Sequence, residues 1–226
     1  YVNKFAAECS RHSWSHEYQQ QLAADVANIF YLLEPLPELS ALPPDHHFVM
    51  AGYTMTNISV PGHSDGHQVF IGNQEILLSG DNLLANYQLH ATDWPHNIQT
   101  NPLQRFLSAM IRLESLPIKQ VLPGHGPVFA NFSERLHLLF QHHFSRIILV
   151  AEKLTQPMTA WELAQKVYPA ADYIHIKRLM LAETLAYLQL MENRRLVTAS
   201  DHDGLTIYEP AFDKPSSFTI QQLFFE

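Results

Sequence analysis

The chain has 226 residues, of which 14 are lysine or arginine and 22 are aspartate or glutamate, so its formal net charge is −8. Hydrophobic residues make up 46% and charged residues 16%, which is typical of a globular protein and excludes a disordered or fibrous chain. The acidic balance argues against a general nucleic-acid binder, because phosphate contacts need a positive surface.

The first predicted element is a helix over residues 16–33, whose apolar residues recur at helical spacing before two prolines. Four short apolar runs bounded by Gly, Pro or Asn then predict strands over residues 48–51, 57–60, 68–71 and 75–78. A helix over 102–116, a strand over 118–122 and a long helix over 133–154 follow. This alternation predicts an α/β layered domain at residues 1–153.

The pattern changes after about Lys153. Thr159 and Glu162 form a capping-box pattern that opens a short helix, and a second helix is predicted over residues 174–195. Two short strands over 197–199 and 205–208 flank a turn. Two helices followed by a two-stranded wing predict a small winged-helix-like domain at residues 154–226. Its acidic balance disfavours DNA binding.

Three segments share one design, in which an apolar strand leads into a tight Gly or Pro turn and then a side chain that can bind metal. They are Val60-Pro-Gly-His63, Leu77-Leu-Ser-Gly-Asp81 and Val121-Leu-Pro-Gly-His125. Glycine lets the backbone turn sharply, so side chains at neighbouring strand ends can converge. Imidazole and carboxylate are suitable ligands for zinc, and also for iron or manganese. We therefore predict a metal site; the alternative is that these are ordinary turn residues.

The order His63, Asp81, His125 resembles the third, fourth and fifth motifs of the metallo-β-lactamase superfamily, which includes glyoxalase II. Val60-Pro-Gly-His63 followed by Gly66-His67 is similar to the third motif, Thr-Pro-Gly-His followed by Gly-His. The segment Glu183-Thr-Leu-Ala-Tyr-Leu188 is similar to the winged-helix tail of the β-lactamase-like protein 2 branch. The resemblance implies an αβ/βα sandwich for the first domain.

The resemblance also implies chemistry. His63 is expected to bind a first metal ion, Asp81 to bridge it to a second, and His125 to bind the second, with zinc as the expected metal and iron or manganese as alternatives. The implied activity is metal-dependent hydrolysis of an ester, thioester or amide of a small molecule. Two alternatives stay open: hydrolysis of a phosphodiester in RNA, and a non-catalytic scaffold.

One family motif is missing. The pattern His-x-His-x-Asp-His, which supplies most metal ligands in the family, does not occur in these 226 residues. We therefore expect the chain to be the C-terminal part of a longer protein, with a partial sandwich. We also expect it to bind metal weakly and to be inactive alone, because a catalytic zinc needs about three protein ligands. An uncovered apolar sheet face predicts self-association.

The other candidate residues favour structural interpretations. His67 could orient the His63 loop or contact substrate, but a structural role is favoured. A loop over residues 87–101, with His90, Asp93 and His96, could border a substrate pocket. The remaining candidates are predicted to be solvated (His12, His16) or structural (His142, His143, Cys9).

The expected setting is the cytoplasm. No apolar run approaches the ~18 residues of a membrane span, and no secretory signal is recognisable. The single cysteine excludes an internal disulfide framework and a multi-cysteine zinc finger. The expected partner is a small-molecule substrate, with neither nucleic acid nor membrane.

Overall fold

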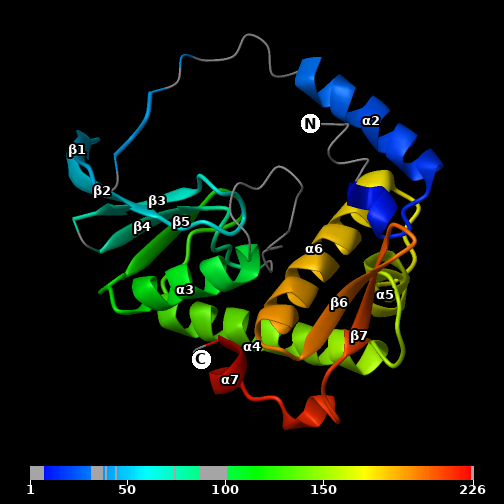
Figure 1. Cartoon of the computed structure of the whole chain (residues 1–226). Coiled ribbons are helices and arrows are strands. Elements are labelled where there is room, and N and C mark those ends of the chain that lie inside the picture. The colour runs from blue at the N-terminus through cyan, green and yellow to red at the C-terminus, as the bar shows by residue number, and fades with distance from the viewer. Residues whose placement is uncertain are drawn as a thin grey trace. The chain divides into compact units, whose positions relative to one another are not determined.

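The computed structural model describes residues 8–31, 38, 40–43, 45–73, 75–86 and 101–224, and its elements are labelled in Figure 1. Contacts divide the chain into two compact units, and the division falls between residues 147 and 148, inside the long helix α4 (Phe132–Lys153). The α/β unit holds the described parts of residues 42–92, 98–147 and 219–226. The helical unit holds the described parts of residues 1–41 and 148–218.

The α/β unit is built on one five-stranded sheet with the order β1-β2-β3-β4-β5. Its strands are β1 (His47–Met50), β2 (Tyr53–Ser59), β3 (Gln68–Gly72), β4 (Ile76–Gly80) and β5 (Gln120–Pro123). The first four strands pair antiparallel, whereas β4 and β5 pair parallel and are connected through α3 (Pro102–Glu114). The predicted α/β class is confirmed.

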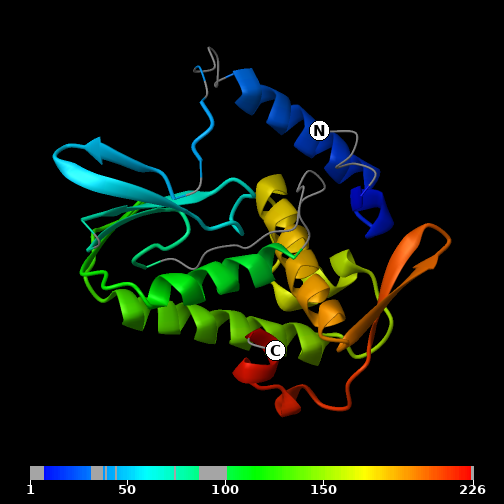
Figure 2. The same ribbon diagram turned by 60° about the vertical axis from the view of Figure 1, so that its left-hand side comes forward.

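The core of this unit lies on one face of the sheet. Ile71, Leu77 and Val121 are register partners on neighbouring strands and are buried. Helix α3 and the first part of α4 run along this face (Figures 1 and 2). The next row across the strands, Phe70, Leu78 and Leu122, faces the other way and is only half-buried. The sheet therefore has one packed apolar face and one partly open apolar face.

The helical unit contains α2 (His16–Tyr31), α5 (Ala160–Val167), α6 (Ile174–Asn193) and a hairpin of β6 (Val197–His202) and β7 (Leu205–Pro210). The capping box of α5 is formed as predicted, because the Glu162 N–H donates to Thr159 Oγ1 and the Thr159 N–H donates to Glu162 Oε2. The predicted order of helices and hairpin is present. The winged-helix assignment and the domain limits 1–153 and 154–226 stay predictions.

Two short elements near the C-terminus lie outside the predicted set. A 3₁₀ turn (Pro215–Ser217) precedes α7 (Ile220–Phe224), which belongs to the α/β unit. Phe224 is buried there, with its ring centroid 6.2 Å from that of Phe140.

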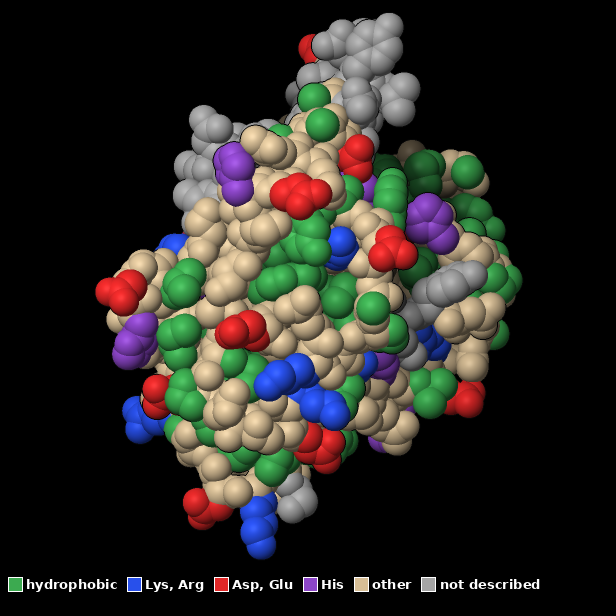
Figure 3. Space-filling model, turned by 90° about the vertical axis from the view of Figure 1, so that its right-hand side faces the viewer, with side chains coloured by type: hydrophobic (Ala, Val, Ile, Leu, Met, Phe, Trp, Pro, Cys, Tyr) green, Lys and Arg blue, Asp and Glu red, His purple; other side chains and the backbone are tan. Residues whose placement is uncertain are grey.

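The described helices and the surface add two observations. Among the described residues, no helix combines the length and the apolar character needed to span a membrane. On the face shown in Figure 3, Lys and Arg side chains are interspersed with Asp and Glu and form no continuous basic area.

Candidate metal centre

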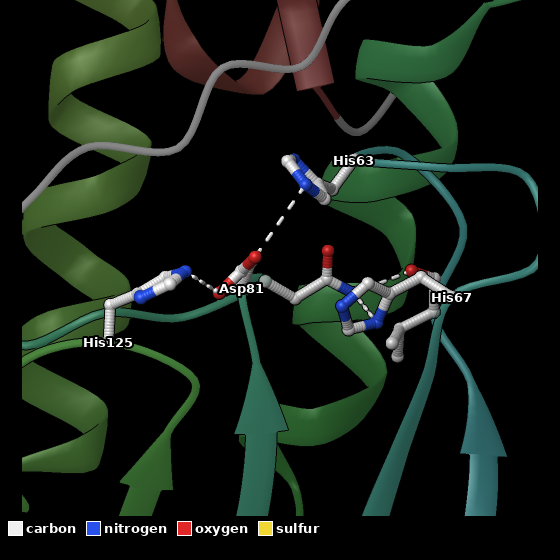
Figure 4. Close-up of polar contacts among 6 residues, drawn as sticks. His63, His67, Asp81 and His125 are labelled. Carbon is white, nitrogen blue, oxygen red and sulfur yellow. Dashed lines mark hydrogen bonds and ion pairs between the residues drawn. The ribbon is translucent and has the colours of Figure 1, made fainter. Parts of the chain in front are cut away.

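The ends of three strands bring His63, Asp81 and His125 together (Figure 4). Asp81 follows β4 and His125 follows β5, and these two strands pair parallel, so their carboxyl ends lie at the same edge of the sheet. The Nε2 atom of His125 lies 3.3 Å from Asp81 Oδ1, and the Nε2 atom of His63 lies 3.9 Å from Asp81 Oδ2. Each oxygen of one carboxylate therefore faces a different imidazole.

The three side chains form two pairs that share Asp81, rather than one cluster. Within the described part of the chain, no three His, Cys, Asp or Glu side chains lie close enough together to hold one metal ion between them. The site is also open to solvent, since the side chains of Asp81, His63 and His125 are 35%, 39% and 72% exposed. The arrangement suits a carboxylate lying between two cations, with coordination positions left over at each.

Glycines make this convergence possible. A Cβ atom at Gly124 would stand 2.5 Å from Asp81 Oδ1, and a Cβ at Gly80 would stand 2.9 Å from the His67 ring. Gly80 also has φ +52°, and Gly62, just before His63, has φ +144° and would overlap Phe106 if it carried a Cβ. A side chain at any of these positions would collide with the site or with the helix behind it.

The loop that carries His63 is held at both ends and from the side. The Val60 N–H donates to the His67 carbonyl oxygen at 2.9 Å, which closes the loop. Arg105 of α3 donates from Nη2 to Asp65 Oδ1 at 2.6 Å, and both side chains are largely buried. This ion pair was absent from the sequence predictions, because nothing in the spacing links two residues so far apart.

His67 lies beside the site, with its ring centroid 6.0 Å from that of His63. Burial lowers the pKa of His67, and the nearby His63 lowers it further, while Asp81 opposes the shift. The Nδ1 atom of His67 accepts a hydrogen bond at 3.0 Å from Asn82, a residue absent from the sequence-predicted candidates. A signal was present, since Asn82 is a polar residue between the candidate ligand Asp81 and the apolar Leu83.

The prediction that His12 is solvated is wrong. His12 is only 2% exposed, contacts Glu8 Oε1 at 3.3 Å and stacks on Tyr208. The prediction did not include Glu8, a carboxylate one helical turn before His12. His16 is exposed as predicted.

The other predicted positions have plain outcomes. Cys9 is buried, and this burial raises the pKa of its thiol, which fits a structural role. His143 is fully buried with its ring edge-on to Phe106. The loop with His90, Asp93 and His96 lies outside the described residues.

Comparisons with known proteins place these features in context. No family model matches the chain. The chain is 26% identical over 111 residues to an atrochrysone carboxyl ACP thioesterase of Aspergillus fumigatus, covering 49% of this chain and 32% of that protein. It is 28% identical over 134 residues to a lactamase-like protein, nscB, of Trichophyton rubrum, covering 59% of this chain and 39% of that protein. The chain thus spans between about a third and two fifths of the length of these relatives.

Among solved structures, the chain resembles a metallo-beta-lactamase family protein of Thermus thermophilus. The TM-score is 0.68 at 27% identity, and the match covers 83% of this chain and 64% of that one.

Proposed function

Because the chain belongs to the metallo-β-lactamase superfamily, we propose that His63, Asp81 and His125 are metal ligands in a metal-dependent hydrolase. The observation that carries this proposal is the position of Asp81, whose two carboxylate oxygens lie 3.3 Å and 3.9 Å from two different imidazoles. A role in the turn alone does not account for imidazoles from two other loops beside both carboxylate oxygens of Asp81. A carboxylate that bridges two cations requires such neighbours.

The donor set fits divalent transition metals in kind. Nitrogen and carboxylate oxygen ligands suit zinc, and also iron and manganese. Asp81 and His63 would hold one ion, and Asp81 and His125 the other. With two ligands apiece, each ion would need further donors, from water or from groups other than these three side chains. We therefore expect this chain to bind zinc more weakly than a site with three protein ligands for each ion.

The remaining residues serve to hold these ligands in place. When bound, a divalent ion supplies polarisation of a substrate carbonyl oxygen and promotes ionisation of water at neutral pH. The protein supplies position: Gly80 and Gly124 leave room for the carboxylate and the imidazole ring, and the Arg105–Asp65 ion pair anchors the His63 loop to α3. Substrate has access, since the ligand side chains are partly exposed.

A thioester of a small molecule is the substrate class that we propose for the whole protein. The thioesterase of Aspergillus fumigatus among the relatives supports a thioester substrate. The net charge of −8 makes a polyanionic substrate such as RNA a poorer partner.

Zinc titration by calorimetry tests the ligand assignment. We expect the wild-type chain to bind zinc, and the variants His63→Ala, His125→Ala and Asp81→Asn each to weaken binding at least about tenfold. His137→Ala is the matched control, because His137 is an exposed histidine of α4 that is not among the three candidate ligands. Unchanged zinc affinity in all three ligand variants would contradict the proposal.

The substrate proposal needs a separate assay. The full-length protein is incubated with S-lactoylglutathione and, in parallel, with single-stranded RNA. Hydrolysis of the thioester, lost on Asp81→Asn, supports the proposal, whereas cleavage of RNA alone would replace the substrate class.

A further inference from the structure

Asn82 is a polar residue buried completely within the candidate metal centre. It follows Asp81 directly, and its side chain has 0% exposure. Its backbone N–H donates to the Ser79 carbonyl oxygen at 3.2 Å, so the turn after β4 fixes its main chain. A wholly buried amide beside a candidate metal ligand needs a reason, because apolar residues fill such positions at lower cost.

The amide nitrogen of Asn82 makes two contacts, both with the loop that carries His63. It donates to the Val60 carbonyl oxygen at 2.6 Å and to His67 Nδ1 at 3.0 Å. The chemistry of the partners fixes the orientation of the amide, since a carbonyl oxygen only accepts and the nitrogen must face it. The same NH₂ group therefore contacts the beginning and the end of the loop over residues 60–67.

We infer that Asn82 is a positioning residue, which ties the His63 loop to the turn that carries Asp81 and holds His67 as the neutral tautomer protonated at Nε2. Because the amide nitrogen of Asn82 can only donate a hydrogen bond, His67 Nδ1 must accept it. Gly80 lies against the other side of the ring, where a Cβ atom would come 3.0 Å from Nε2. The ring thus lies between an amide donor and a glycine backbone.

The oxygen of the same amide supports this assignment. Asn82 Oδ1 is buried and has no hydrogen-bond partner among the described residues. An unpaired buried acceptor is destabilising, so packing alone does not explain asparagine at this position. The two donor contacts do explain it, because no other side chain of this size presents two N–H groups in one plane.

The tautomer of His67 can be measured without any metal. In the uniformly ¹⁵N-labelled, metal-free chain, long-range proton–nitrogen correlation spectra distinguish the two ring nitrogens. We expect His67 to be protonated at Nε2 and unprotonated at Nδ1. A proton on Nδ1 in the wild-type chain would overturn the inference, whether or not any variant folds.

Two variants test the cause. Asn82→Asp keeps the shape but replaces the donors with an oxygen, and we expect the proton of His67 to move to Nδ1. Asn73→Asp is the matched control, because Asn73 uses Oδ1 to accept the Thr54 N–H at 3.1 Å and aspartate keeps that acceptor. A His67 tautomer that is the same in Asn82→Asp as in the wild type would contradict the inference.

The link to the metal rests on the proposed function and is tested separately. Asn82→Leu removes the donors without adding charge near the ligands, and we expect it to weaken zinc binding at least about tenfold, because the turn that carries Asp81 would lose its contacts with both ends of the His63 loop. Asn73→Asp should leave zinc affinity unchanged. If the wild-type chain binds no zinc, the proposed function fails while the tautomer result still stands. If Asn82→Leu binds zinc like the wild type, the positioning role is wrong.

Discussion

Gly124 occupies a position where any side chain would collide with the carboxylate of Asp81. A Cβ atom there would stand 2.5 Å from Asp81 Oδ1 and 3.1 Å from the carbonyl carbon of Gly80, which is main chain and cannot move aside easily. Gly124→Ala should therefore push Asp81 away from His125. We expect zinc affinity, measured by calorimetry, to fall at least about tenfold.

Gly66 provides the matched control, since it lies in the His63 loop but a Cβ atom there would meet nothing within 4 Å. Gly66→Ala should leave both zinc affinity and the urea unfolding midpoint nearly unchanged. Equal zinc affinity in the Gly124 and Gly66 variants would show that Asp81 does not need its present position.

The three candidate ligands could be selected from sequence because each follows a strand and a glycine within a few residues. The residues that position them could not. Asn82 acts on Val60 and His67 through one amide, and Arg105 acts on Asp65 from a separate helix. Such contacts depend on how strands and helices meet in space, which no local pattern records. Sequence identifies the donors of a site more readily than the contacts that orient them.

The capping box of α5 is a local device whose contribution can be isolated. Thr159 is 2% exposed and accepts the Glu162 N–H, while the Glu162 side chain accepts the Thr159 N–H at 2.8 Å. Thr159→Ala leaves a helix N–H without its partner, so we expect a loss of about 1 kcal/mol in the free energy of unfolding. Urea denaturation followed by circular dichroism measures it.

Thr155→Ala serves as the control, because Thr155 is exposed and lies before the helix. It should shift the unfolding midpoint little. If Thr159→Ala also leaves the unfolding midpoint nearly unchanged, the cap does not stabilise the helical unit.

Elements with strong hydrophobic periodicity were predictable, and weaker ones were not. The strand predicted at residues 57–60 in fact begins at Tyr53. Its first two residues are exposed, and Tyr53 and Met55 alternate with threonines, so this part of the strand contains no apolar run. Ala51 and Gly52, both with positive φ, make the tight hairpin turn before it. Helix α7 is only five residues long, too short for periodicity to mark, and it is ordered by contacts with α3 and Phe140.

We expect the partly open sheet face to associate with a second copy of the chain. A hollow of about 260 Å³ on this face is lined mainly by apolar side chains: Met50, Met55, Ile76, Leu78 and Leu122. Apolar surface left in water favours association. We expect light scattering to show a mass that rises with concentration, and Met50→Lys to reduce this rise by placing a charge at the hollow.

The variant Val49→Lys distinguishes association through this face from association through the free edge of β1. Val49 is 74% exposed and adjacent to Met50, but its side chain points to the opposite face of β1. If β1 associates through its free edge, both variants should reduce association. If the apolar face associates, only Met50→Lys should. A monomer at every concentration would contradict the expectation for this surface.

The parallel pairing of β4 and β5 has a consequence for the order of folding. The antiparallel pairs β1–β2, β2–β3 and β3–β4 join strands that are adjacent in the chain and close only short loops. β5 joins β4 across a much longer stretch of chain that includes α3, and closing a longer loop costs more conformational entropy. We therefore expect the strands next to His63 and Asp81 to pair before β5, which precedes His125. We expect the two halves of the candidate metal centre to form one after the other as the chain folds.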